Sequence, residues 1–145
     1  IYLSHNYKKS KQMKKKSYIP ENNPHKQNTG LKRLFLAFVN SISGFNFAIK
    51  EESAFRQELL LCLFLVPLIF IFPTSPIEKI LMIGSLLLLL IVELLNSSIE
   101  AAIDRISFSH HDLSKRAKDL GSAAVLVALS LVVITYLSVL TKFLI

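Results

Sequence analysis

The sequence predicts an all-α membrane protein, with an amphipathic surface helix followed by three transmembrane helices. Hydrophobic residues make up 52% of the 145 residues and the mean hydropathy is +0.47, which is too apolar for an ordinary soluble domain. One segment with helical periodicity precedes three long apolar runs. The four helices are expected at about residues 30–50, 59–77, 80–102 and 120–140.

Basic residues are concentrated in the first part of the chain, and the net charge is +7. Residues 1–29 are polar and rich in lysine and show no signal-peptide core, so we expect a disordered basic tail ahead of one membrane domain, 30–145. This distribution suits an anionic membrane surface. Nucleic acid is not the expected partner, because no zinc-finger, helix-turn-helix or RNA-binding signature accompanies the basic residues.

The surface helix is predicted from the periodicity of segment 30–50. Apolar residues recur at helical spacing from Leu31 and Phe35 to Ile49, whereas the basic residues fall mostly elsewhere around the helix. This pattern is typical of a helix that lies in the plane of the membrane interface.

The three apolar runs supply the predicted spans. The first, 59–77, has no charged residue and is close to the roughly 20 residues needed to cross about 30 Å of hydrocarbon. The second, 80–102, is apolar up to Glu93, and the third, 120–140, is long enough to cross. Lys and Arg are abundant in the tail and in the connection 107–119, so we expect a cytoplasmic N-terminus and an external C-terminus.

Carboxylates inside the second span need a reason, because a charge at the membrane centre costs roughly 2.5 to 3.5 kcal/mol. With about 3.6 residues per turn, Glu93, Asn96, Glu100 and Asp104 fall on one stripe that descends to the cytoplasmic surface. Three spans enclose little space, so such polar faces favour self-association.

A second acidic group, Glu51, Glu52 and Glu58, lies where the surface helix turns into the first span. Two carboxylates that approach one another there could bind Mg²⁺, which takes oxygen ligands and bridges to the phosphates of a nucleotide. The alternative is a set of solvated acids, which we prefer for Glu51, whereas we prefer a functional role for Glu100.

Segment 112–119 opens the third span and carries Lys118, which could hold a phosphate, although basic residues beside a span are often only anchors. His110 and His111 lack the further ligands that a zinc site needs. No phosphate-binding glycine loop, Rossmann glycine pattern or protein-kinase catalytic loop is present, so side chains would hold the phosphates.

Three segments closely resemble the prokaryotic diacylglycerol kinases: Glu-Ser-Ala-Phe-Arg-Gln-Glu at 52–58, Ile-Val-Glu-Leu-Leu-Asn-Ser-Ser-Ile-Glu-Ala-Ala-Ile-Asp-Arg at 91–105, and Arg-Ala-Lys-Asp-Leu-Gly-Ser-Ala-Ala-Val at 116–125. The resemblance extends from about Gly30 to the C-terminus. It implies a homotrimeric inner-membrane enzyme that transfers the γ-phosphoryl group of ATP to diacylglycerol and gives phosphatidic acid.

By motif position, the resemblance implies that Glu93 is the general base for the lipid hydroxyl, that Glu52 and Glu100 bind Mg²⁺ together with ATP, and that Asn96 and Asp104 support them. The implied nucleotide-binding residues are Arg33, Asn40, Glu52, Glu100, His111, Lys118 and Asp119. The implied lipid-binding residues are Arg33, Ala54, Phe55, Arg56, Gln57, Glu58, Glu93, Ser122 and Tyr136. By the same resemblance, the lipid site is shared between neighbouring chains.

The chain departs from the family's familiar pattern at Asn40, where an aromatic residue is common, at Asn46, where a basic residue is common, at Lys115, where a glycine is common, and at Tyr136, where a tryptophan is common. His111 alone keeps the family's residue type within 109–111. None of these changes removes a carboxylate from the proposed centre.

Three alternatives remain. The same chemistry on undecaprenol is the nearest. A small transporter-like protein would use Glu93 as its proton or cation site, but inverted repeats are absent and the acids cluster at one interface. A scaffold that only anchors the basic tail leaves Glu93 and Glu100 unexplained.

Overall fold

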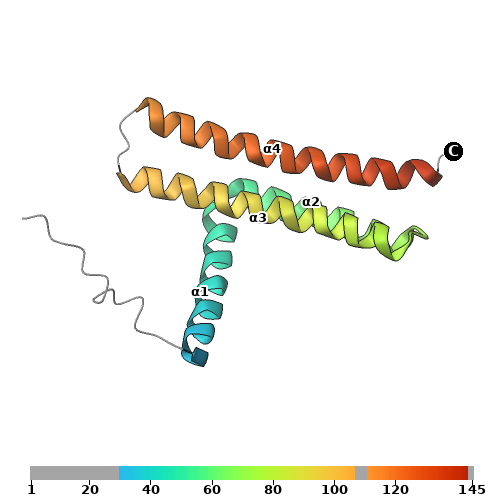
Figure 1. The fold of residues 1–145 in the computed structure, drawn as a ribbon, viewed down its shortest axis with the longest axis horizontal. Coiled ribbons are helices and arrows are strands. Elements are labelled where there is room, and N and C mark those ends of the chain that lie inside the picture. Colours follow the sequence, from blue (N-terminus) through green and yellow to red (C-terminus); the bar gives the residue numbers. More distant parts are fainter. Residues whose placement is uncertain (1–29, 107–110, 144–145) are drawn as a thin grey trace, which may run out of the picture. The chain divides into compact units, whose positions relative to one another are not determined.

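The computed structural model describes residues 30–106 and 111–143, so the predicted basic tail, 1–29, lies outside the described residues. Figure 1 shows the helical elements, which are α1 (Gly30–Glu51), α2 (Ser53–Ile71), α3 (Pro76–Ile106), α4 (Asp112–Leu140) and the short 3-10 helix η4 (Thr141–Phe143). In the described ranges only Glu52, residues 72–75 and His111 lie outside these helices. The predicted all-α fold is confirmed.

By its internal contacts the chain divides into two units, 1–40 and 41–145. In the described part of the first unit, the side chains of Leu34, Phe35 and Phe38 are 65–68% exposed. Large apolar side chains exposed together are typical of a surface that meets a membrane or a partner. The second unit holds the rest of α1 and the other helices.

Three helical segments are long and apolar enough to cross a membrane: α2, α3 and α4 continued by η4. Only 11–33% of the residues in their most apolar windows are buried within the chain. Helices satisfy their own backbone hydrogen bonds, so apolar side chains on their outer faces are stable in hydrocarbon. The prediction of three membrane-crossing helices is confirmed.

The helix that carries the first predicted span has different ends from the apolar run. The run was expected to span 59–77, whereas α2 begins at Ser53 and ends at Ile71, and Ile77 belongs to α3. Polar residues at the start of a helix do not stop it from forming, and the apolar run continues across a turn into the next helix. Hydropathy therefore locates the membrane-crossing part of a helix and not its ends.

The start of α3 is defined by a capping box that the apolar pattern conceals. The Ser75 backbone N–H donates to Glu78 Oε2 at 2.8 Å, and the Glu78 N–H donates to Ser75 Oγ at 3.3 Å. Pro76 follows as the first helical residue, where its missing N–H leaves no hydrogen bond unmade. Glu78 also forms an ion pair with Lys142 of η4. The order Ser-Pro-x-Glu is the sequence signal for this turn.

We expect Ser75→Ala to lower the free energy of unfolding by about 1 kcal/mol, because the first turn of α3 loses the hydroxyl that caps it. Thermal unfolding in detergent micelles, followed by circular dichroism, measures this change. Ser75→Thr keeps the hydroxyl group and is the matched control. An Ala variant as stable as the Thr variant would contradict the assignment of the cap.

The apolar core lies where α3 packs against both α2 and α4 (Figure 1). Its buried residues come from all three helices: Ile69, Met82, Leu86, Leu89, Ala128, Val132, Tyr136 and Val139. The Tyr136 side chain is 5% exposed, and its hydroxyl group donates to the carbonyl oxygen of Leu65 at 3.5 Å. The structure thus places Tyr136 in the core, and its predicted contact with lipid stays a prediction.

Candidate functional site

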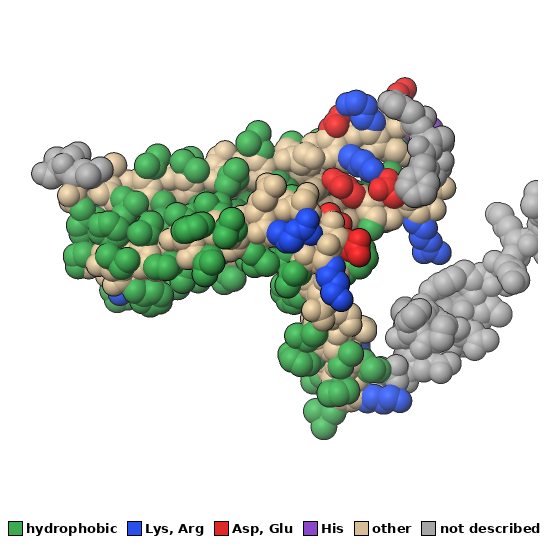
Figure 2. Space-filling model, turned by 180° about the vertical axis from the view of Figure 1, so that it is seen from behind, with side chains coloured by type: hydrophobic (Ala, Val, Ile, Leu, Met, Phe, Trp, Pro, Cys, Tyr) green, Lys and Arg blue, Asp and Glu red, His purple; other side chains and the backbone are tan. Residues whose placement is uncertain are grey.

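Charged side chains gather at one end of the long helices, where α3 ends and α4 begins (Figure 2). The predicted stripe of α3 leads to this polar end. The Glu93 side chain is 3% exposed and that of Asn96 is 9% exposed, whereas Glu100 and Asp104 are partly buried. Asn96 Nδ2 donates to Glu100 Oε1 at 3.3 Å. The stripe therefore runs from a deeply buried carboxylate toward the polar end of the helix.

A polar pocket of about 320 Å³ at this end joins the start of α2 to α3 and α4. Its lining residues are Glu52, Ser53, Ala54, Glu93, Asn96, Glu100, Ser122 and Val125. Sequence reasoning missed Ser53 and Val125. Ser53 lies between two predicted site residues, and Val125 lies one helical turn after Ser122, so their positions in the chain were the available signals. Every other lining residue was predicted, and the fold brings them together from three separate segments.

Glu52 lies at the junction between two helices, and this position allows its side chain to line the pocket. Its backbone is extended, with φ −97° and ψ 110°, between the end of α1 and the start of α2. Arg56 Nη1 donates to the carbonyl oxygens of Ile49 at 3.2 Å and Lys50 at 3.1 Å. These carbonyl groups end α1 without a partner within the helix, and a cation there is favourable. Arg56, predicted to border the lipid, thus holds the α1–α2 junction in this structure.

Two lysines at the start of α4 pair with carboxylates. Lys118 Nζ lies 2.6 Å from Asp104 Oδ1, and this pair joins α4 to α3. Lys115 Nζ lies 2.6 Å from Asp119 Oδ2, one helical turn away. Two of the residues predicted to bind nucleotide, Lys118 and Asp119, are therefore held in ion pairs at the polar end.

Three other residues predicted to bind nucleotide are not among the lining residues of this pocket. His111 Nδ1 accepts a hydrogen bond from the Leu113 backbone N–H at 3.2 Å and so caps the start of α4. Arg33 and Asn40 belong to the first unit and are exposed there. Their contact with nucleotide stays a prediction.

The first turns of α2 carry the remaining predicted lipid contacts. Phe55 is 1% exposed, and its ring centroid lies 6.4 Å from that of Phe45 in α1. Gln57 is exposed. Glu58 is partly buried, and its Oε2 atom is buried without a hydrogen-bond partner among the described residues. A buried carboxylate oxygen without a partner is costly, which is typical of a functional site.

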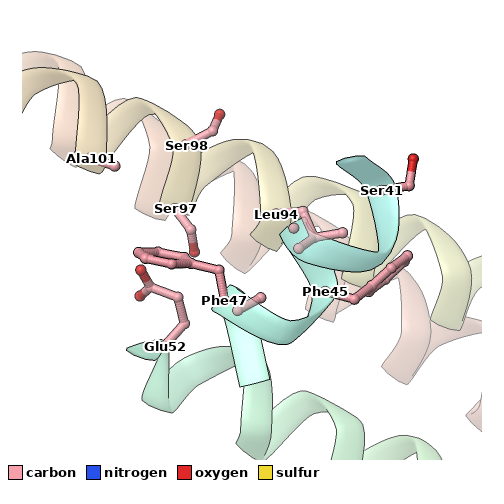
Figure 3. A pocket seen from close by; sticks show the side chains of 10 residues that line it. Ser41, Phe45, Phe47, Glu52, Leu94, Ser97, Ser98 and Ala101 are labelled. Atoms are coloured by element: carbon pink, nitrogen blue, oxygen red, sulfur yellow. The ribbon is translucent and has the colours of Figure 1, made fainter. Parts of the chain in front are cut away.

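An apolar pocket of about 500 Å³ lies between the second half of α1 and α3. It is lined by Ser41, Gly44, Phe45, Phe47, Ala48, Glu52, Leu94, Ser97, Ser98 and Ala101. Figure 3 shows the Glu52 carboxylate among these side chains, with Phe47 and Ser97 at the same end of the pocket. Glu52 therefore lines both pockets. Apart from Glu52, these residues were not predicted as site residues, because periodicity identified the apolar face of α1 but not the helix opposite it.

Comparison with known proteins identifies the family. The model of the family described as prokaryotic diacylglycerol kinase matches residues 39–140. A diacylglycerol kinase of Pseudomonas aeruginosa is 50% identical over 117 residues, which are 81% of this chain and 95% of that protein. Those of Haemophilus influenzae and Escherichia coli K12 are 47% and 45% identical over 108 residues, 74% of this chain and 92% and 88% of those proteins. The chain belongs to the prokaryotic diacylglycerol kinase family.

Proposed function

We propose that this chain catalyses the ATP-dependent phosphorylation of diacylglycerol to phosphatidic acid at the cytoplasmic interface of a bacterial inner membrane. Its family and the names of its relatives support this reaction. The observation that carries the proposal is the polar pocket. It is lined by the buried Glu93 carboxylate, which belongs to the membrane-crossing helix α3, and by the carboxylates of Glu52 and Glu100. A lipid hydroxyl and a water-soluble nucleotide can both approach such a position.

Glu93 acts as the general base in this proposal. The hydroxyl oxygen of the lipid attacks the γ-phosphorus, its proton passes to the Glu93 carboxylate, and the bond from the γ-phosphorus to the bridging oxygen breaks to release ADP. Burial of Glu93 supports this role, because the energetic cost of a carboxylate in a membrane helix otherwise has no compensation in the described contacts. The base then lies at the depth of a lipid head group.

Glu52 and Glu100 would hold Mg²⁺ together with the phosphates of ATP. They line the same pocket, and Mg²⁺ is commonly bound by one or two carboxylates with substrate phosphates completing its coordination. When bound, the ion neutralises negative charge on the transferring phosphoryl group. Asn96 keeps the Glu100 carboxylate in place through its amide hydrogen bond.

Lys118 and Asp119 form the nucleotide side of the proposed site, and Asp104 supports Lys118. The Lys118–Asp104 ion pair is partly exposed, so the pairing is weak enough for a phosphate to replace the carboxylate as the partner of Lys118. The apolar pocket fits an acyl chain of the lipid, since it is lined largely by apolar side chains and meets the polar pocket at Glu52.

We further propose a homotrimer with a cytoplasmic N-terminus. The exposed apolar faces of α2, α3 and α4 support association within the membrane. The abundance of Lys and Arg in the tail and in the connection 107–119 supports this orientation. The protein mass in detergent, measured by light scattering, distinguishes a trimer from a monomer.

The test of function is transfer of labelled γ-phosphate from Mg-ATP by the purified protein in mixed micelles, with diacylglycerol and undecaprenol offered side by side. We expect labelled phosphatidic acid. Labelled undecaprenyl phosphate alone would move the chain to the polyprenol reaction. A folded sample that labels neither lipid would refute the kinase proposal.

A further inference from the structure

Gly121 of α4 faces the Asn96 side chain of α3 at very short range. A Cβ atom added at Gly121 would collide with Asn96 Oδ1 and would lie 3.2 Å from Asn96 Cγ. A Cβ at Gly44 or at Gly84 meets nothing within 4 Å, so the close approach belongs to Gly121 and is not common to the helix glycines. Any side chain at position 121 would force the Asn96 carboxamide to move.

The two ends of the Asn96 carboxamide have different surroundings. Its Oδ1 atom is buried and has no hydrogen-bond partner among the described residues, whereas its Nδ2 donates to Glu100 Oε1 at 3.3 Å. The direction from Gly121 Cα to the missing Cβ leads toward Oδ1, so a hydrogen atom fits there and a methyl group does not. With Oδ1 directed at Gly121, the amide nitrogen is left to face Glu100.

The carboxamide has little room to turn away. Asn96 is 9% exposed and lies between Glu93 and Glu100 on the face of α3 that borders the polar pocket. Ser122, the residue after Gly121, lines the same pocket, so this part of α4 is in direct contact with the site. A shift of Asn96 would therefore change the pocket itself.

We infer that Gly121 is a positioning residue for Glu100. Because Gly121 has no side chain, the Asn96 carboxamide fits between α3 and α4 in the orientation that donates to Glu100, and this hydrogen bond directs the carboxylate into the pocket shared with Glu52. Loss of a residue that orients a metal ligand typically weakens metal binding by about 10- to 100-fold. The inference rests on the proposed role of Glu52 and Glu100 in binding Mg²⁺.

The test compares Gly121→Ala with Gly84→Ala, the same substitution in a neighbouring helix at a position with open space. We expect Gly121→Ala to raise the Mg²⁺ concentration for half-maximal lipid phosphorylation by about 10- to 100-fold, with most of the kcat recovered at saturating Mg²⁺. Binding of Mn²⁺ with a non-hydrolysable ATP analogue, followed by electron paramagnetic resonance, should weaken by a similar factor. Gly84→Ala should change neither value.

A double variant keeps the inference testable if Gly121→Ala does not fold. Asn96→Ala removes the carboxamide and makes room for the new methyl group, so Asn96→Ala/Gly121→Ala should fold and should match Asn96→Ala in its Mg²⁺ requirement and its Mn²⁺ affinity. Wild-type Mg²⁺ dependence in a folded Gly121→Ala would overturn the inference. So would a further loss when Gly121→Ala is added to Asn96→Ala. A wild-type protein that labels no lipid would instead refute the proposed function.

Discussion

Replacement of Glu93 by glutamine should reduce kcat for lipid phosphorylation by about 10²- to 10⁴-fold, because the amide cannot accept the proton of the lipid hydroxyl. Glutamine has nearly the same shape, and the change removes a carboxylate that is 3% exposed, so the fold should persist. The measurements are initial rates of labelled phosphatidic acid formation and the affinity for an ATP analogue, which should remain close to that of wild type.

Glu51→Gln is the matched control for this substitution. Glu51 ends α1, is exposed and lines neither pocket, so the loss of its charge should leave the rate unchanged. Glu93→Gln and Glu51→Gln both replace one carboxylate by an amide and change the net charge equally. A difference between their rates therefore reports on the position of the carboxylate. Full activity in Glu93→Gln would show that Glu93 is not the general base. A loss confined to ATP affinity would show instead that Glu93 contacts the nucleotide.

The helices and the acidic stripe were predictable because each depends on local sequence. Only a helix or a closed barrel satisfies the backbone hydrogen bonds inside a membrane, and a continuous apolar run of about 20 residues has the length of a helix. Glu93, Asn96 and Glu100 recur at helical spacing, so they share a face wherever α3 is placed. The position of α2 was less predictable, because its first turns, from Ser53 to Glu58, include three consecutive polar residues and precede the apolar run.

The site residues come together only when separate helices pack against one another, so local sequence does not predict the complete site. Nothing in the periodicity of α3 indicates that Glu52 and Ser122 line the same pocket as Glu93. The position of Glu52 at the start of the first span suggested a shared magnesium site, but Ser122 was assigned to the site only through the resemblance to a family. A glycine such as Gly121 is suited to close helix contact, but the identity of its partner, Asn96, depends on the register between α3 and α4. The residues of the capping box, Ser75 and Glu78, have the expected spacing in the sequence. They were not recognised as a helix start because the apolar run 59–77 continues across Ser75.

Glu100→Gln should produce a different kinetic defect from Glu93→Gln. A ligand to Mg²⁺ contributes to binding of the ion and the nucleotide, so its loss should raise the Mg²⁺ concentration for half-maximal activity by at least about tenfold, and excess Mg²⁺ should restore much of the rate. Loss of the base cannot be restored in this way. Activity measured against free Mg²⁺ at a fixed ATP concentration separates the two defects.

Glu52→Gln should show the same dependence on Mg²⁺ as Glu100→Gln, because both carboxylates line one pocket. Glu52 reaches it from the α1–α2 junction and Glu100 from α3. If both contact one ion, the double variant should lose less than the product of the two single effects, since ligands of a shared ion are not independent. Glu51→Gln, beside Glu52 but exposed, is again the control. An Mg²⁺ activation curve for Glu100→Gln that superimposes on that of wild type would show that Glu100 does not bind the ion, and strictly multiplicative effects at positions 52 and 100 would argue for two separate sites.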